Sequence, residues 1–216
     1  MSKISGVDEA GRGCVIGPLI VAIATCERKN EKTLKKYGKK DSKQLTKEQR
    51  ETTLVELNKI CTFSIQEITA QNLNQLMKKM SLNEIEASAM AELCKKNPES
   101  DTVIDMPDRY GRTFRARMER FGVTKFEGEH KADENYPIVA AASIMAKVTR
   151  DNLIEKIKTE VGFDFGSGYP SDPRTISALI DPIKRKKLEP YIRQMWKTLD
   201  NLKQKKLFDD EITGNQ

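Results

Sequence analysis

The sequence has few of the residues on which several common catalytic sites depend. Its 216 residues include a single histidine, His130, and a single tryptophan, and aromatic residues make up 6% of the chain. Because the one histidine is flanked by Glu129 and Lys131, no arrangement of serine or cysteine with histidine is supported. We therefore do not expect an activated serine or cysteine nucleophile.

Cysteine is sparse as well, and its spacing argues against a common metal site. No two of the four cysteines, at positions 14, 26, 61 and 94, have the two-residue spacing of a zinc knuckle. With one histidine in the chain, a structural zinc site is not expected. This cysteine usage favours reduced thiols, and we expect a cytoplasmic protein.

Long apolar segments are missing too. No stretch approaches the roughly 20 apolar residues that a helix needs to cross a bilayer. Residues 1–6 lack the apolar centre of a signal peptide. We expect a soluble protein that makes no membrane contact.

Basic residues outnumber acidic residues. The chain has 38 lysines and arginines against 32 aspartates and glutamates, which gives a net charge of +6 and an isoelectric point near 9.0. This balance favours a polyanionic partner, nucleic acid first, although many basic proteins bind no nucleic acid. The length suffices for one domain with its own core and a small appendage.

The order of apolar patterns predicts a sheet flanked by helices. Strands are expected at 4–7, 15–26, 62–66, 102–105 and 123–126, and helices at 46–58, 81–96, 109–120 and 133–160. The second strand is expected to pair with residues 3–8. Residues 162–173 are rich in glycine, serine and proline, which predicts a loop, and the remainder is basic and helical. This order indicates an α/β fold with a mixed five-stranded sheet and helices on both faces.

Asp8 and Glu9 stand where the apolar run 4–7 gives way to Gly11 and Gly13. Successive strand side chains point to opposite faces, so aiming both acids at one point needs a bend, which the glycines allow. Two carboxylates in contact repel by roughly 4 kcal/mol at an effective dielectric of about 20. A divalent cation offsets this repulsion, and oxygen ligands suit magnesium or manganese.

Two further acids lie at expected element ends. Asp105 ends the strand 102–105, and Asp133 stands at the start of the long helix. Ligands of open sheets gather where strands end, and four carboxylates there can hold two divalent ions about 3.5–4 Å apart for phosphodiester hydrolysis. Taken alone, Asp133 fits a helix cap equally well, and Asp105 fits a turn before Pro107.

Several other side chains are candidates for contacts with nucleic acid. Ser42 and Lys43 lie in a basic stretch and fit either a phosphate contact or a solvated face. Tyr169 lies in a glycine-flanked loop and fits either stacking on a sugar or base, or packing over the sheet. Ser143 and Lys147 are one helical turn apart and fit surface positions or phosphate contacts.

These motifs together resemble the ribonuclease HII family, the type 2 ribonucleases H, and look most like its archaeal branch. The matching segments are Gly6–Gly13, Asp41–Leu45, Asp105, His130–Lys147, Gly166–Asp172 and Arg193–Thr198. They follow the family's order across most of the chain. One departure is Cys14, where the family is expected to have proline.

The resemblance implies an RNase H-like fold, with a catalytic domain at 1–171 and a helical substrate-binding extension at 172–216. It implies hydrolysis of RNA in RNA/DNA hybrids, and incision at ribonucleotides embedded in duplex DNA. It also implies two ions of Mg²⁺ or Mn²⁺. The products would carry 5′-phosphate and 3′-hydroxyl ends.

The resemblance also assigns roles to individual residues. The family's metal-binding acids fall on Asp8, Glu9, Asp105 and Asp133. Its turn that reads the ribose 2′-hydroxyl, the group that separates RNA from DNA, falls on Gly11, Arg12 and Gly13. Its junction-sensing tyrosine falls on Tyr169, and Lys43 falls on a phosphate contact.

Two other functions compete with this interpretation. A non-catalytic nucleic-acid-binding module would explain the charge but not the acids. A magnesium-dependent nuclease or recombinase of the same fold, acting on DNA alone, would share the acids without needing a ribose sensor. Because the chain has no heptad seam, we expect a monomer.

Overall fold

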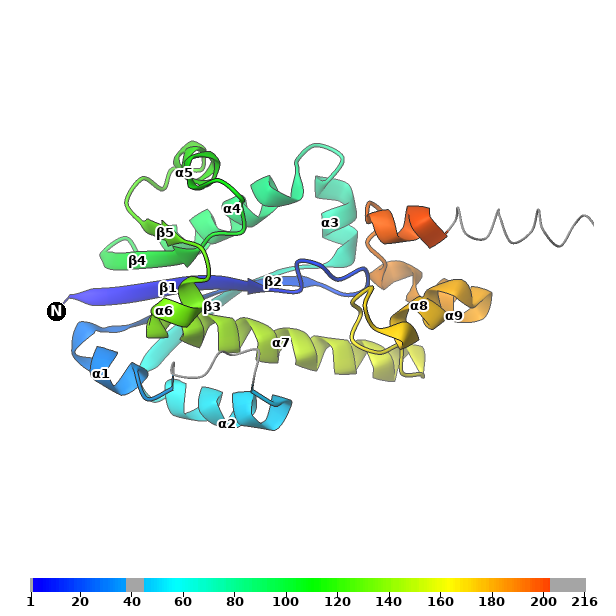
Figure 1. Ribbon diagram of the computed structural model, residues 1–216, viewed down its shortest axis with the longest axis horizontal. Coiled ribbons are helices and arrows are strands. Elements are labelled where there is room, and N and C mark those ends of the chain that lie inside the picture. The colour runs from blue at the N-terminus through cyan, green and yellow to red at the C-terminus, as the bar shows by residue number, and fades with distance from the viewer. Residues whose placement is uncertain (1, 38–44, 203–216) are drawn as a thin grey trace, which may run out of the picture. The chain divides into compact units, whose positions relative to one another are not determined.

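The computed structural model describes residues 2–37 and 45–202, and its chain forms two compact units (Figure 1). Of the described residues, the sheet unit contains 2–12, 19–37, 45–67 and 80–152. The helical unit contains residues 13–18, 68–79 and 153–202. No helix among the described residues is long and apolar enough to cross a membrane.

The sheet unit is built on a mixed five-stranded sheet, as the sequence predicts, and the order of its strands is β3-β2-β1-β4-β5. The strands are β1 Lys3–Ala10, β2 Leu19–Glu27, β3 Cys61–Ile68, β4 Ser100–Asp105 and β5 Glu127–Glu129. β1 pairs antiparallel with β2 and parallel with β4, and β4 pairs parallel with β5. Because β1 is central and β4 ends beside it, the acids of these two strands lie at one end of the sheet.

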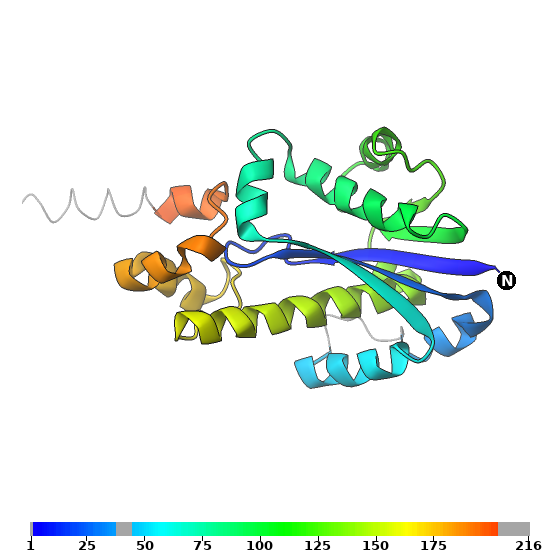
Figure 2. The same cartoon turned by 180° about the vertical axis from the view of Figure 1, so that it is seen from behind.

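Helices cover both faces of this sheet, as Figures 1 and 2 show from opposite sides. α4 (Leu82–Lys95) and α5 (Gly111–Arg120) lie over one face. The other face is covered by α6 (Ala132–Asn135) and the first part of α7 (Pro137–Val161). The short elements η1 (Arg28–Asn30) and α1 (Glu31–Leu34) follow β2, and α2 (Lys47–Leu57) lies outside α7.

Local capping determines where two of these helices begin. The Thr46 side chain accepts from the backbone of Gln49, whose side chain accepts in return from the Thr46 backbone, so α2 starts with a capping box. Ser81 and Glu84 form the same arrangement at the start of α4. Both starts fall where the sequence predicts them, because a capping box involves only residues three apart.

Close packing of β1 against α7 requires glycine at position 6. A Cβ atom on Gly6 would lie 2.4 Å from the carbonyl carbon and oxygen of Ile138. The surrounding core includes Ile4, Ala24 and Ile144, all at most 7% exposed. The start of α7 is therefore held directly against the strand that carries Asp8 and Glu9.

The sequence-based prediction of one helix over 133–160 is wrong. α6 ends at Asn135 and α7 begins at Pro137, with Tyr136 between them in an extended conformation (φ −115°, ψ 107°). Proline disfavours helical geometry in the residue before it, which explains the break. β5 also starts later than predicted, at Glu127 instead of Val123.

Two other boundaries differ from the prediction. β1 extends to Ala10, which pairs with Ile20, so Asp8 and Glu9 lie inside the strand. The strand predicted from Val15 begins at Leu19, because Gly17 adopts φ +94° and Pro18 follows it.

The helical unit has its own core. It comprises α3 (Ala70–Leu76), which the sequence analysis missed, the last part of α7, α8 (Pro173–Ile180), α9 (Pro182–Leu188) and η2 (Glu189–Tyr191). Val15 and Ile16 are buried in this core, and Ile16 forms an isolated bridge with Ile192. The division into domains at 171/172 stays a prediction.

We expect Gly6→Ala to destabilise the protein by about 1–3 kcal/mol, because the added methyl group overlaps the backbone of α7. Urea unfolding at neutral pH measures this change. The matched control is Gly111→Ala, where the new Cβ would meet Met106 at an ordinary 3.5 Å. Equal stability of the two variants would contradict the packing argument.

Candidate active site

Asp8 and Glu9 occupy neighbouring positions in the central strand and face different surroundings. Strand alternation sends their side chains to opposite faces of β1. Asp8 is 5% exposed, and its Oδ1 accepts from the Glu9 backbone amide at 2.7 Å. Ser143 of α7 hydrogen-bonds the Asp8 carboxylate and Lys147 lies near it, whereas the cation near Glu9 is Arg12.

Asp105 lies at the end of β4, directly beside β1. Its partly buried carboxylate interacts electrostatically with both Asp8 and Glu9. Its Oδ1 also accepts from the backbone amide of Ala132 at 3.1 Å, which ties it to the first residue of α6. Asp105 therefore links the acids of β1 to the segment that carries Asp133.

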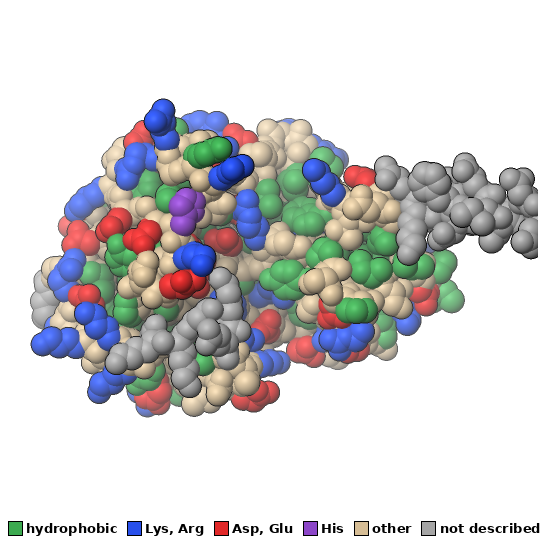
Figure 3. All heavy atoms as spheres, in the orientation of Figure 1, with side chains coloured by type: hydrophobic (Ala, Val, Ile, Leu, Met, Phe, Trp, Pro, Cys, Tyr) green, Lys and Arg blue, Asp and Glu red, His purple; other side chains and the backbone are tan. Residues whose placement is uncertain are grey.

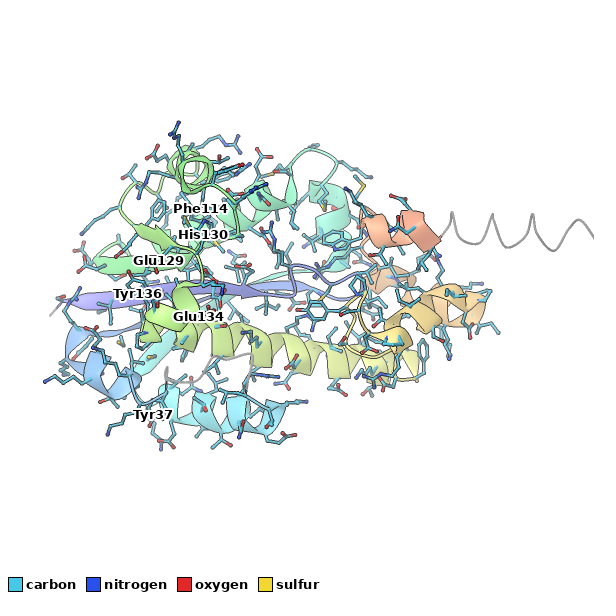
Figure 4. All side chains as sticks on the ribbon, viewed as in Figure 1. Tyr37, Phe114, Glu129, His130, Glu134 and Tyr136 are labelled. Carbon is cyan, nitrogen blue, oxygen red and sulfur yellow. The ribbon has the colours of Figure 1, made fainter. Side chains whose placement is uncertain are left out.

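Asp133 is buried in the first turn of α6, with 6% exposure. The residue that starts this helix, Lys131, has a left-handed backbone (φ 55°), and no other non-glycine residue in the described chain has a positive φ. Such backbone strain persists where the surrounding structure holds it. Figure 4 shows His130 on the segment that joins β5 to α6, and Glu134 on α6.

Burial and repulsion from neighbouring carboxylates raise the pKa of both β1 acids. Burial contributes most to raising the pKa of Asp8 to about 7, the Ser143 hydrogen bond opposes it, and Asp105 adds to it. Burial again contributes most to raising the pKa of Glu9 to about 8, with further increases from Asp8 and Asp105 and a decrease from Arg12. A cation at this point would favour the charged form of each acid.

The donor set fits a hard divalent cation. Glu9 Oε2 and Asp133 Oδ1 are buried and have no hydrogen-bond partner among the described residues. Carboxylate oxygens without protein partners suit Mg²⁺ or Mn²⁺. Within residues 2–37 and 45–202, however, no three acidic, histidine or cysteine side chains stand in metal-binding geometry. Asp8 and Asp105 instead accept from backbone amides, so the four-ligand set stays a prediction.

The turn after β1 carries Arg12 between two glycines. Gly11 adopts φ +90°, a conformation that L side chains rarely adopt. The Arg12 guanidinium pairs with Glu86, and its Nη2 donates to Asn83 Oδ1 at 2.6 Å. The side chain at the centre of the turn is therefore attached to α4.

Tyr169 lies against the last residue of this turn, within the helical unit. Its ring carbons would lie 3.8 and 3.9 Å from a Cβ atom on Gly13. The Gly168 carbonyl accepts from the amides of Val15 (2.9 Å) and Ile16 (3.2 Å), which follow Gly13 in the chain. Asp172 accepts from the Ser167 amide at 2.8 Å and supports the same loop. Backbone contacts thus place the half-buried Tyr169 beside Gly13.

The remaining candidates divide into two groups. Ser143 and Lys147 both approach Asp8 from successive turns of α7, and their expected phosphate contacts stay predictions. Ser42 and Lys43 lie outside the described residues, so their role also stays a prediction.

Sequence analysis missed Glu86 and Asp108 as partners of arginines. Leu82 and Ala89 belong to the apolar stripe of α4, and Glu86 lies on the same stripe, four residues after Leu82 and three before Ala89. An acidic residue at the spacing of an apolar stripe is the sequence signal that could have identified Glu86. Asp108 is 3% exposed and pairs with Arg117.

Solved structures with this fold define the class of protein. The Pyrococcus horikoshii ribonuclease H2 is 38% identical and matches with a TM-score of 0.82 over 94% of this chain and 98% of its own. The Archaeoglobus fulgidus RNase HII, solved in a complex with PCNA, is 42% identical with a TM-score of 0.83 over 92% and 95%. The fold is thus the α/β fold of the ribonucleases H.

The sequence comparisons then identify the family. The family model described as Ribonuclease HII matches residues 5–199. A curated Ribonuclease HII from Archaeoglobus fulgidus is 42% identical over 95% of this chain and 98% of its own length, and one from Methanocaldococcus jannaschii is 40% identical over 94% and 98%. The chain belongs to the ribonuclease HII family. It is a metal-dependent hydrolase of the ribonuclease H type.

Protonated Asp8 and Glu9 contribute to the free energy of unfolding of the metal-free protein. We expect this contribution to be lost as the pH rises from about 4 to about 8. Their folded pKa values, about 7 and about 8, exceed the ordinary 3.8 and 4.5, so the contribution is present below the ordinary values and lost above the folded ones. At about 1.4 kcal/mol per pKa unit, the loss reaches several kcal/mol. Magnesium should therefore stabilise the protein more at pH 8 than at pH 5.

Urea unfolding in EDTA and in magnesium, at pH 5 and pH 8, measures this difference. The control is Asp8→Asn, which removes the Asp8 charge and should reduce both the pH dependence and the magnesium effect. A magnesium effect of equal size at the two pH values would contradict the expectation.

Proposed function

We propose that the protein hydrolyses the RNA strand of RNA/DNA hybrids and also incises duplex DNA at embedded ribonucleotides, by a two-metal mechanism. The observation that carries this proposal is the meeting of Asp8, Glu9 and Asp105 at one end of the sheet, close enough that Asp105 raises the pKa of both β1 acids and Asp8 raises the pKa of Glu9. A basic protein of the ribonuclease HII family has little other use for three repelling acids at this position.

The residues that would hold the ions are Asp8, Glu9, Asp105 and Asp133. Two divalent ions bound there would supply Lewis-acid stabilisation of the phosphodiester oxygens and would increase the acidity of a water nucleophile. The unpartnered oxygens of Glu9 and Asp133 support this assignment. Lys147, which approaches Asp8, adds positive charge beside the same carboxylate. Mg²⁺ and Mn²⁺ both suit these oxygen ligands.

Recognition of ribose is assigned to the turn Gly11–Gly13 and to Tyr169. Glycines at both ends let the backbone approach a 2′-hydroxyl closely, and that hydroxyl distinguishes RNA from DNA. The contact between Tyr169 and Gly13, which both belong to the helical unit, supports a shared role, because an aromatic ring beside this glycine could stack on a sugar.

Basic side chains would hold the duplex by its phosphates. Figure 3 shows lysine and arginine side chains over α5, near the exposed His130. Contacts of this kind make binding weaken as salt concentration rises. Lys43 and Ser42 remain candidates for such contacts, and we expect the protein to act as a monomer.

One assay separates this function from its two alternatives. Duplex DNA with one ribonucleotide and its all-DNA counterpart are incubated with and without magnesium, and the product ends are mapped. The proposal requires magnesium-dependent cleavage of the first duplex alone, leaving 5′-phosphate and 3′-hydroxyl ends. Cleavage of both duplexes would favour a DNA nuclease, and binding without cleavage would favour a binding module. A 2′,3′-cyclic phosphate product would contradict the mechanism.

We expect Asp8→Asn to lower kcat by at least about a hundredfold while leaving the Kd for substrate nearly unchanged, because it removes a metal ligand and none of the basic surface. Single-turnover kinetics and fluorescence anisotropy measure the two quantities. The control is Asp101→Asn, an exposed acid near the other end of β4 that pairs with Arg28. Equal loss of binding and turnover in Asp8→Asn would instead assign Asp8 a structural role.

Tyr169→Ala should reduce kcat/KM for a single embedded ribonucleotide by about tenfold, the loss expected when one stacking contact is removed. Tyr169→Phe keeps the ring against Gly13 and should retain most of this activity. Steady-state kinetics on the one-ribonucleotide duplex measure both variants. Wild-type kinetics in Tyr169→Ala would remove Tyr169 from the site.

A further inference from the structure

Glu86, in the second turn of α4, is a buried acid outside the proposed metal ligands. Its side chain is 0% exposed, and its Oε1 has no hydrogen-bond partner among the described residues. Taking a carboxylate out of water is unfavourable, and replacing a buried ion pair by apolar residues is often neutral or stabilising. Stability alone therefore does not explain a glutamate on the apolar stripe of this helix.

The partner of Glu86 is the arginine at the centre of the turn after β1. Arg12 Nη1 donates to Glu86 Oε2, and Arg12 Nη2 donates to Asn83 Oδ1 at 2.6 Å. Residues 83 and 86 lie three apart and so share one face of α4. Two bonds from one guanidinium to one rigid helix fix both its position and its orientation.

This attachment is itself held by a wider network. The Asn83 amide donates to Asp108, which also accepts from Arg117 of α5. Asp108 is 3% exposed and follows Asp105 by three residues. The network therefore connects the turn, α4, the segment after β4, and α5. A buried polar network whose members are paired makes its surroundings rigid.

The turn needs an anchor because its backbone is permissive. Gly11 and Gly13 flank Arg12, and glycine restricts the backbone less than any other residue. Glu9 and Asp108 also attract the Arg12 guanidinium. The bonds to Glu86 and Asn83 therefore hold the Arg12 guanidinium against the attraction of these two acids.

We propose that Glu86 is a positioning residue that acts through Arg12 to hold the turn Gly11–Gly13 in the conformation that reads ribose. This inference rests on the proposed function, because it concerns the turn to which ribose recognition is assigned. It assigns Glu86 no contact with substrate. Because the pair is largely buried, its effect should persist at salt concentrations that weaken surface ion pairs.

A double-mutant cycle tests whether Glu86 acts through Arg12. The variants are Glu86→Gln, Arg12→Ala and the combination of the two, with Glu86→Asp as a variant that keeps the charge. The control is Glu92→Gln, which removes an exposed acid of the same helix that pairs with Lys95. For each variant, kcat and KM are measured on a duplex with one ribonucleotide, together with the Ki of the all-DNA duplex as competitor.

We expect Glu86→Gln to lower kcat/KM by about tenfold or more, mainly through KM, since a misplaced positioning group far from the chemistry can cost this much. The Ki of the all-DNA duplex should stay the same, so the preference for ribose falls. Adding Glu86→Gln to Arg12→Ala should cause no further loss, because groups that act as one unit are not additive. Glu86→Asp should show a smaller loss, and Glu92→Gln none.

A merely structural Glu86 would give different results. Partial unfolding lowers the active fraction, and hence kcat, but leaves KM and the ratio of ribose to deoxyribose affinity unchanged. Additive losses in the double variant, or wild-type KM in folded Glu86→Gln and Glu86→Asp, would overturn the inference. If the wild-type protein itself fails to discriminate the two duplexes, the proposed function has failed. If it discriminates and the cycle is additive, only the role of Glu86 has failed.

Discussion

Repulsion among three neighbouring carboxylates is the constraint on which the arrangement of the sheet unit depends; Asp8 is buried, and Glu9 and Asp105 are partly buried. Asp8 and Glu9 are neighbours in the central strand, and parallel pairing with β4 brings Asp105 beside them. Gly6 lets α7 pack against the same strand, so water is largely excluded from Asp8. Burial and proximity thus raise the free energy of the ionised acids in the fold, and a bound divalent cation would lower it again.

Strand alternation connects this group of acids to both layers of helices. On one side α7 brings Ser143 and Lys147 to Asp8, and on the other Arg12, near Glu9, is fixed to α4. The proposed chemistry and the proposed recognition of ribose therefore depend on different faces of one strand. A substitution in either helical layer can therefore alter the surroundings of the acids without replacing any of them.

The features predicted from the sequence are those determined by neighbouring residues. Thr46 and Ser81 start helices through bonds to residues three positions away, and the apolar runs indicate the strands and the mixed sheet. The break before Pro137 was also local and was overlooked. The attachment of Arg12 to Glu86 was not predictable, because it joins residues 74 positions apart, and no local pattern specifies that pairing. The ligand roles of the four acids came from the family resemblance and stay predictions.

Three features of the described chain are unfavourable locally, and all lie near the proposed site. Asp8 is a buried acid beside other acids, Glu86 is a buried acid on an apolar stripe, and Lys131 adopts a left-handed backbone. Their physical origins differ, since they involve repulsion, desolvation and steric strain respectively. Sequences selected for stability alone avoid such features, and real proteins tolerate them chiefly where function requires them. Their common location therefore supports the end of β1 and β4 as the functional site, independently of the family to which the chain belongs.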